Sequence, residues 1–294
     1  VLYAPDNTPG NKTLFTKSVA RTLLAKIYAE KPLRDYTKVI QYCDEVKADG
    51  FDLVDDFSDL FGMNAAGTDA KMRNTKESIL EAQFTSGAGN WCTWMFGRDL
   101  VNWNNNFTWA KWVTPSRDLI SAFKQEGDEV RFKESIVYYD CNWSNYYPSD
   151  NYPFMYKCRS ANSSIIKYRY ADVLLLKAEA LIMQDTPDLE GAADIIDKVR
   201  DRAKLGALPT SVRSNKNAML NALLKERRLE LAFEGQRWFD LVRLDKVEEV
   251  MNAVYAKDSG RKAQIYTFDK NSYRLPIPQS VIDANDKIHQ NPGY

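Results

Sequence analysis

Histidine is almost missing from the 294-residue sequence, which contains only His289, near its C-terminal end. Because histidine is the most frequent general base and a frequent zinc ligand, this scarcity excludes most His-based catalysis and most zinc enzymology. The four cysteines are far apart and form no CxxC pair: Cys43, Cys92, Cys141 and Cys158. Neither a zinc site nor a dense disulfide framework is therefore expected, and one disulfide bridge and free buried thiols both stay open.

An excess of charge and a long apolar run are missing as well. Forty Lys and Arg residues balance forty Asp and Glu residues, whereas nucleic acids and anionic membrane faces attract basic patches. No stretch approaches the ~18 apolar residues of a membrane-spanning helix. The chain begins at Val1 without a signal peptide, and we expect a truncation or processing boundary there. We expect no nucleic-acid partner, cofactor, metal site or catalytic residue.

Helical periodicity is clear near the N-terminal end. One apolar stripe has the spacing i, i+3, i+4, i+7 and consists of Ala20, Leu23, Leu24 and Ile27. A second stripe runs from Tyr36 to Val46, after a polar turn around Pro32, and stops before Gly50. The two stripes predict a helix–turn–helix unit of tetratricopeptide type.

A second unit of this kind is predicted over residues 168–205. Its first helix carries an apolar stripe of Ala171, Leu175, Ala178 and Ile182. Asp188 is predicted to cap the start of its second helix, and Gly206 stands where a helix end favours glycine. Further helices are predicted over about 215–234 and 236–256.

The middle of the chain, residues 51–166, differs from both ends in its periodicity and composition. It lacks a long helical stripe except from Leu119 to Phe123, and it is rich in Asn, Ser, Gly and aromatic residues. A stretch of this length inside a compact protein is either disordered or functional, and its aromatic content argues against disorder. We therefore predict a loop-rich ligand-binding region here, within a single domain of residues 1–294.

Three carboxylates follow one another at helical spacing: Glu226, Glu230 and Glu234. They could form a metal or acid–base site, but carboxylate metal sites in helical bundles usually recruit Glu-x-x-His pairs, and no histidine is near in the sequence. We predict an ion-pair lattice that fixes the helix against its neighbours. The basic residues expected to form ion pairs with these carboxylates are Arg227, Arg228, Arg237 and Arg243.

Four segments follow one another in the order of a known family: KYRYADVLLLKAEALI (167–182), AADIIDKVRDRAKLGALP (192–209), KERRLELAFEGQRWFDLVR (225–243) and RLPIPQ…HQNPGY (274–294). Together with TKSVARTLLAKIYAE (16–30), FDLVDDFSDLFG (51–62) and TKESILEAQF (75–84), they make nearly the whole chain resemble the SusD/RagB family. The family's leading helices, lipoprotein signal and lipidated cysteine are not in this sequence, and we expect them only in the intact protein.

The resemblance implies a mainly α, SusD-like helical scaffold with tetratricopeptide-like helix pairs. It implies a non-catalytic, surface-exposed protein of the bacterial outer membrane that holds a glycan or another nutrient and delivers it to a SusC-like TonB-dependent transporter. The membrane would be reached through a lipid anchor outside this chain. The family's ligand contacts come from variable loops, so the resemblance assigns no binding residue.

Aromatic and polar residues interleave in two segments of the middle region. Sugar rings have apolar faces that lie on flat aromatic side chains, and hydroxyl rims that pair with amide, carboxylate or guanidinium groups. Segment 90–112 holds five tryptophans among asparagines. Segment 140–152 follows the same logic, with one tryptophan and three tyrosines among Asn, Ser and Asp. The residues predicted to bind ligand are Trp91, Trp94, Arg98, Asp99, Trp103, Asn104, Trp143 and Tyr146.

Other functions stay open at this point. A peptide or another non-sugar nutrient is the alternative within the same family, and a tetratricopeptide adaptor is the alternative from another class. A glycoside hydrolase is disfavoured because hydrolysis needs two carboxylates at a defined separation, and segment 90–112 contains only Asp99.

Overall fold

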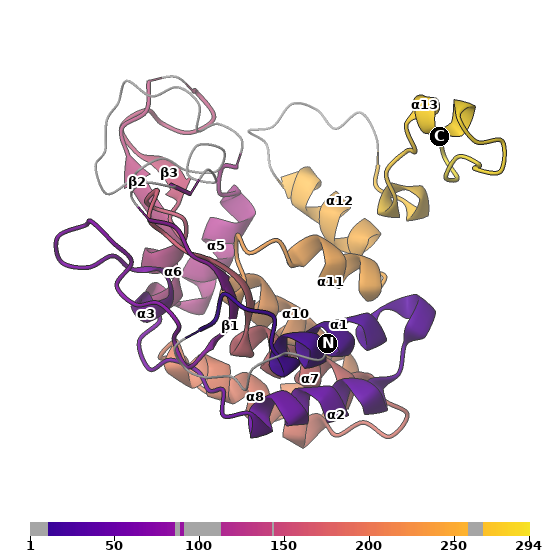
Figure 1. Ribbon diagram of the computed structural model, residues 1–294, viewed down its shortest axis with the longest axis horizontal. Coiled ribbons are helices and arrows are strands. Elements are labelled where there is room, and N and C mark those ends of the chain that lie inside the picture. Colours follow the sequence, from indigo (N-terminus) through magenta and orange to yellow (C-terminus); the bar gives the residue numbers. More distant parts are fainter. Residues whose placement is uncertain (1–10, 86–88, 91–112, 143, 258–266) are drawn as a thin grey trace. The chain divides into compact units, whose positions relative to one another are not determined.

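The structure is a computed structural model that describes residues 11–85, 89–90, 113–142, 144–257 and 267–294. The chain forms two compact units, residues 1–236 and residues 237–294 (Figure 1). Helices dominate the described residues, which confirms the predicted mainly α class. Every helix in this part of the chain is too short or too polar to traverse a lipid bilayer.

Two helix pairs build the core of the first unit (Figure 1). α1 (Lys17–Ala29) packs against α2 (Tyr36–Ala48), and α7 (Tyr170–Met183) packs against α8 (Leu189–Arg202). α2 also contacts α7, so the two pairs share one apolar core. α10 (Lys216–Glu230) covers α7 as well, and nearly all of α7 is buried as a result. The predicted tetratricopeptide-like pairing is confirmed.

The buried face of α1 differs from the predicted one. Small or short side chains face the core instead, namely Ser18, Val19, Thr22, Ala25 and Ala29. Leu23 of the predicted stripe is 45% exposed, and Ala20, Leu24 and Ile27 are only partly buried. Small side chains allow the backbones of neighbouring helices to approach closely. The apolar periodicity of the sequence does not show which face of a helix makes such a close contact.

Two small antiparallel sheets lie in the described part of the first unit. β1 (Ser78–Ala82) pairs with β4 (Ile165–Arg169), next to the helix pairs. β2 (Ile136–Tyr139) pairs with β3 (Tyr152–Met155), from Ile136 opposite Met155 to Tyr139 opposite Tyr152. The loop of residues 140–151 connects β2 to β3.

In the described part of the predicted loop-rich region 51–166, three short helices pack near these sheets. These helices are α3 (Ser58–Phe61), α5 (Arg117–Glu126) and α6 (Glu129–Ser135), and α5 is the helix indicated by residues 119–123. Leu119, Ile120 and Phe123 of α5 pack on an apolar cluster that includes Ile136 and Leu229. A fourth short helix, α9 (Thr210–Arg213), precedes α10.

A cluster of buried charges joins these elements, and we call it the charge cluster. The predicted ion-pair lattice around Glu226, Glu230 and Glu234 is confirmed. Its cations, however, are not the arginines that neighbour these glutamates in the sequence. Arg227 and Arg228 instead pair with Asp172 and Asp118, on α7 and α5. The charge cluster consists of Glu77, Asp128, Glu226, Glu230 and Glu234 with Arg131, Lys157, Arg169, Arg200 and Arg202.

The second unit contains α11 (Arg237–Arg243), α12 (Val247–Lys257), α13 (Gln279–Asp283) and the 3₁₀ helix η2 (Lys270–Tyr273). The single helix predicted over 236–256 is wrong, because the chain turns between α11 and α12. At this turn the backbone of Asp245 adopts a left-handed conformation, with φ of 55°.

Candidate ligand-binding site

The loop between β2 and β3 forms one wall of the candidate site. The strands hold its two ends together, and the Cys141 amide donates to the Ser149 carbonyl at 2.6 Å. The Asn151 amide donates to the Pro148 carbonyl at 3.2 Å, which turns the chain back toward β3. The loop is thus fixed at its base while its tip faces solvent.

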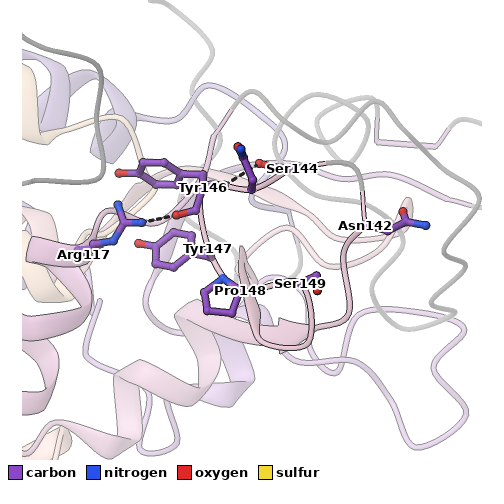
Figure 2. A pocket seen from close by; sticks show the side chains of 8 residues that line it. Arg117, Asn142, Ser144, Tyr146, Tyr147, Pro148 and Ser149 are labelled. Atoms are coloured by element: carbon purple, nitrogen blue, oxygen red, sulfur yellow. Dashed lines mark hydrogen bonds between the residues drawn. The ribbon is translucent and has the colours of Figure 1, made fainter.

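A hollow of about 810 Å³ opens between this loop and the start of α5, and we call it the first hollow (Figure 2). Its volume lies in the range of small-molecule binding sites. Its lining combines three aromatic or cationic groups with four short polar side chains and one proline: Arg117, Tyr146 and Tyr147 with Asn142, Ser144, Asn145, Ser149 and Pro148. No carboxylate is among these described lining residues.

Two tyrosines and one arginine form the aromatic side of the first hollow (Figure 2). The rings of Tyr146 and Tyr147 meet edge to face, with centroids 4.9 Å apart. The guanidinium carbon of Arg117 lies 4.2 Å from the Tyr146 centroid and 4.5 Å from that of Tyr147. Cation–π contacts of this kind hold planar groups in a fixed orientation, so this side is stiff before any ligand arrives.

Hydrogen bonds to the backbone fix this aromatic group further. The Tyr147 hydroxyl donates to the Pro115 carbonyl at 2.7 Å, and the Arg117 guanidinium donates to the Tyr146 carbonyl. The Tyr146 amide donates to the Ser144 hydroxyl at 3.3 Å. These bonds connect the loop with the segment that leads into α5, two parts of the chain about thirty positions apart.

The polar side of the first hollow is arranged differently. The side chains of Asn142, Asn145 and Ser149 make no hydrogen bond within the described part of the chain, and all three residues are exposed. Polar groups that the fold does not use are available to a ligand. The first hollow therefore offers a rigid aromatic surface next to free amide and hydroxyl groups.

A second hollow of about 450 Å³ adjoins the first one and shares Arg117, Tyr147 and Pro148 with it. One face of α5 forms its floor, with Ile120, Ser121, Lys124 and Gln125. Tyr138 of β2 and Asn151 of the loop complete its lining. Because the hollows share a wall, a ligand longer than one ring can occupy both.

Half of the chain, residues 147–294, matches the sequence model of the SusD family. The chain belongs to the SusD family. It is 35% identical over 143 residues to SusD-like protein P2 of Formosa agariphila, an alignment that covers 46% of this chain and 27% of that protein. It is 42% identical over 99 residues to SusD-like protein P38 of the same organism, covering 32% and 19%.

Solved structures share this SusD-family fold over almost the whole chain. One is surface glycan-binding protein A from Bacteroides thetaiotaomicron in complex with laminarihexaose, with a TM-score of 0.71 and 19% identity. The match covers 96% of this chain and 65% of that one. At this identity the likeness shows the fold alone. The chain spans less than two thirds of the length of these relatives.

The structure places one of the predicted site residues of this SusD-family chain. Tyr146 lines the first hollow, where its ring stacks on Arg117 (Figure 2). Seven others lie outside the described residues: Trp91, Trp94, Arg98, Asp99, Trp103, Asn104 and Trp143. The binding role of all eight stays a prediction.

Several lining residues carried too little signal in the sequence to be chosen. Tyr147 and Asn142 lie in segment 140–152, whose composition did indicate a site, but composition does not rank neighbours. Arg117 and Lys124 lie on a helix more than fifteen positions before that segment. Their spacing of seven, which places them on one helix face, would have indicated a shared surface once α5 was assigned.

Proposed function

We propose that the chain binds a glycan without catalysing a reaction on it. The observation that carries this proposal is the first hollow, where the fixed rings of Tyr146 and Tyr147 adjoin polar side chains that the fold leaves unused. A sugar presents an apolar ring face and a rim of hydroxyls, so it matches both sides of the first hollow. The loop-rich region 51–166 is the ligand-binding part of the single domain in this proposal.

Two further points support a glycan binder over a hydrolase. The related surface glycan-binding protein A, which has the same fold, was solved with laminarihexaose. A glycosidase needs two carboxyl groups beside the scissile bond, whereas the described residues that line the two hollows include no Asp or Glu.

The cellular setting that we propose follows from family membership. In the intact protein a lipid anchor outside this chain would hold the domain on the surface of the outer membrane. The bound glycan would then pass to a SusC-like TonB-dependent transporter. A surface-exposed hollow with modest affinity suits such a transfer, because a ligand that must be handed on has to dissociate.

Substitution of Tyr146 tests the glycan site. Tyr146→Ala should weaken binding to the best ligand of a polysaccharide panel by about three- to tenfold, since one aromatic contact contributes about 0.5–1.5 kcal/mol. Asn142→Ala, which removes a side chain without a partner in the described structure, should weaken binding with little change in melting temperature. Affinity electrophoresis followed by calorimetry measures both effects.

A matched control is available on the helix pair α1–α2. There Tyr28 stacks on Tyr42 with centroids 5.9 Å apart, and the Lys38 ammonium lies 4.4 Å from the Tyr28 centroid. Tyr28→Ala removes a similar aromatic–cation stack where neither hollow lies, so it should leave glycan binding unchanged. Equal affinity loss in Tyr28→Ala and Tyr146→Ala, or binding of peptides but of no polysaccharide, would contradict the proposal.

A further inference from the structure

The second hollow differs from the first in charge, and it carries an inference that rests on the proposed function and specifies its ligand. Arg117, Ile120, Ser121 and Lys124 follow the spacing i, i+3, i+4, i+7, so one face of α5 lines this hollow. Arg117 and Lys124 are two helical turns apart, a separation of about 10 Å along the axis, comparable with the span of a disaccharide.

The described residues that line the second hollow include no Asp or Glu beside Lys124. The acidic residues of α5 itself are neutralised by residues outside the two hollows. Asp118 pairs with Arg228 at 2.6 Å, and Glu126 pairs with Arg200 at 2.7 Å and also with Lys225.

Asp128 and Glu129 follow α5 and line neither hollow, and Asp128 pairs with Arg131. Two further carboxylates belong to the loop of residues 140–151. Asp140 and Asp150 are exposed there, and neither lines a hollow. The positive charge of Lys124 therefore meets no carboxylate among the described lining residues, and it lowers the energy of an anionic group placed beside it.

Lys124 is available for such a group. Its ammonium takes part in no ion pair within the described residues, and the residue is exposed. The guanidinium of Arg117, in contrast, is already oriented by Tyr146 and Tyr147. The second hollow thus combines a positioned cation with one that can adjust its position to a ligand.

Two hydrogen-bond donors line the second hollow together with these cations. Tyr138 projects from β2, and its hydroxyl has no hydrogen-bond partner in the described part of the structure. Burial raises the pKa of Tyr138, so the hydroxyl stays a donor at neutral pH. The side-chain amide of Asn151 likewise has no partner among the described residues. Donors and cations together favour an anion over a neutral hydroxyl.

We propose that the glycan bound by this chain is acidic, and that the second hollow receives its carboxylate or sulfate group through Lys124. The neutral part of the glycan lies on Tyr146 and Tyr147 in the first hollow. Specificity for acidic over neutral glycans then depends on an ammonium that the fold itself does not use.

Paired oligosaccharides test this inference with the full 294-residue chain. One pair is a galacturonate oligomer and its carboxyl-reduced counterpart, and the other is a sulfated galactan oligomer and its desulfated counterpart. Calorimetry should give at least about fivefold tighter binding to the charged member of one pair, and added salt should reduce this ratio. The pair that shows the preference identifies the anionic group.

Variants of two lysines assign the effect to the second hollow. Lys124→Gln should bring the charged-to-neutral affinity ratio close to one, and Lys124→Arg should preserve it. Lys133→Gln removes the same charge from an exposed position of α6 outside both hollows and should leave the ratio unchanged. Melting temperatures of the three variants control for folding.

Each outcome decides between the two proposals. Glycan binding without a preference for the charged members, or a preference that survives Lys124→Gln, overturns this inference and leaves the proposed function intact. A chain that binds none of the charged, neutral or panel glycans overturns the proposed function, and this inference with it.

Discussion

Single side chains of the charge cluster connect parts of the first unit that are distant in sequence. Glu230 pairs with Arg131, Arg169 and Arg202, which lie 99, 61 and 28 positions away. Burial alone raises the pKa of Glu230, but these cations and Lys157 outweigh it and hold that pKa well below its ordinary value. The spacing of the three glutamates indicated a lattice, but a sequence spacing cannot show partners brought in by the tertiary fold.

Removing one charge from the charge cluster tests its structural role. Glu230→Gln keeps the shape of the side chain and leaves Arg169 and Arg202 buried without full neutralisation. The free energy of unfolding should fall by about 3–5 kcal/mol, the cost of breaking a buried pair by removing one partner. Urea denaturation followed by circular dichroism measures this change.

An exposed pair provides the control for Glu230→Gln. Glu190, whose side chain is 69% exposed, pairs with Arg213 on the surface. Glu190→Gln should change the free energy of unfolding by less than about 1 kcal/mol, because exposed ion pairs contribute little. If Glu230→Gln lowered the free energy of unfolding no more than Glu190→Gln does, the buried charge cluster would not stabilise the fold more than an exposed ion pair.

At the level of secondary structure, the ends of three helices share one hydrogen-bond pattern. α5, α8 and α11 each close with a residue of positive φ, and the next amide donates to a carbonyl five positions earlier. Gly127 takes the left-handed position after α5, but Lys204 and Asp245 take it after α8 and α11. Sequence reasoning relies on glycine for this position, so it assigned Gly206 wrongly and missed the turn at Asp245.

Replacing the left-handed lysine should stabilise the chain. Lys204 has a φ of 61°, is exposed and forms no ion pair in the described part of the chain. Left-handed backbone costs residues other than glycine about 1 kcal/mol or more, so Lys204→Gly should raise the free energy of unfolding by about 0.5–1 kcal/mol. Thermal and urea unfolding measure the gain.

Gly206→Ala is the matching control at the same helix end. Gly206 has no positive φ, and open space surrounds the position of an added Cβ. The alanine variant should be as stable as the parent or slightly more stable, because it restricts the unfolded chain. A marked loss of stability in Gly206→Ala would restore Gly206 as the required residue of this turn.

Over the whole molecule, the helical scaffold was more predictable than the site. The helix pairs follow from apolar periodicity and from caps such as Asp188, which accepts the Gly191 amide as expected. The buried face of α1 was not predictable, because Ala25 and Ala29 give weaker periodic signals than the outward Leu23. In the site, composition indicated the segment with Tyr146, whereas Arg117 and Lys124 reach the same surface only through folding.

The pH dependence of global stability tests how the charge cluster holds the chain together. Lys157, just after β3, donates to the Glu230 carbonyl at 2.8 Å and pairs with Glu234 at 2.6 Å. Burial lowers the pKa of Lys157 to about 8 from 10.5, against the opposing effect of Glu234. Below about pH 8 both folded and unfolded chains carry this proton, so Lys157 adds no pH dependence there.

Between pH 8 and the unfolded value of 10.5, the unfolded chain binds a proton that the folded chain has released. The free energy of unfolding therefore rises with pH, and Lys157 should contribute about 1 kcal/mol between about pH 7.5 and pH 9. From about pH 8 upwards Cys43 opposes this trend, because burial raises the pKa of its thiol above the unfolded value of 9.0 and the unfolded chain releases this proton first. Lys157→Met keeps Cys43, so the difference between the two profiles isolates Lys157. Urea denaturation across this window should give a free energy of unfolding that rises more with pH in the parent than in Lys157→Met. If the free energies of unfolding of the parent and of Lys157→Met changed with pH in parallel, the pKa of Lys157 would be the same in the folded and the unfolded chain. The burial of its ammonium beside Glu230 and Glu234 would then be contradicted.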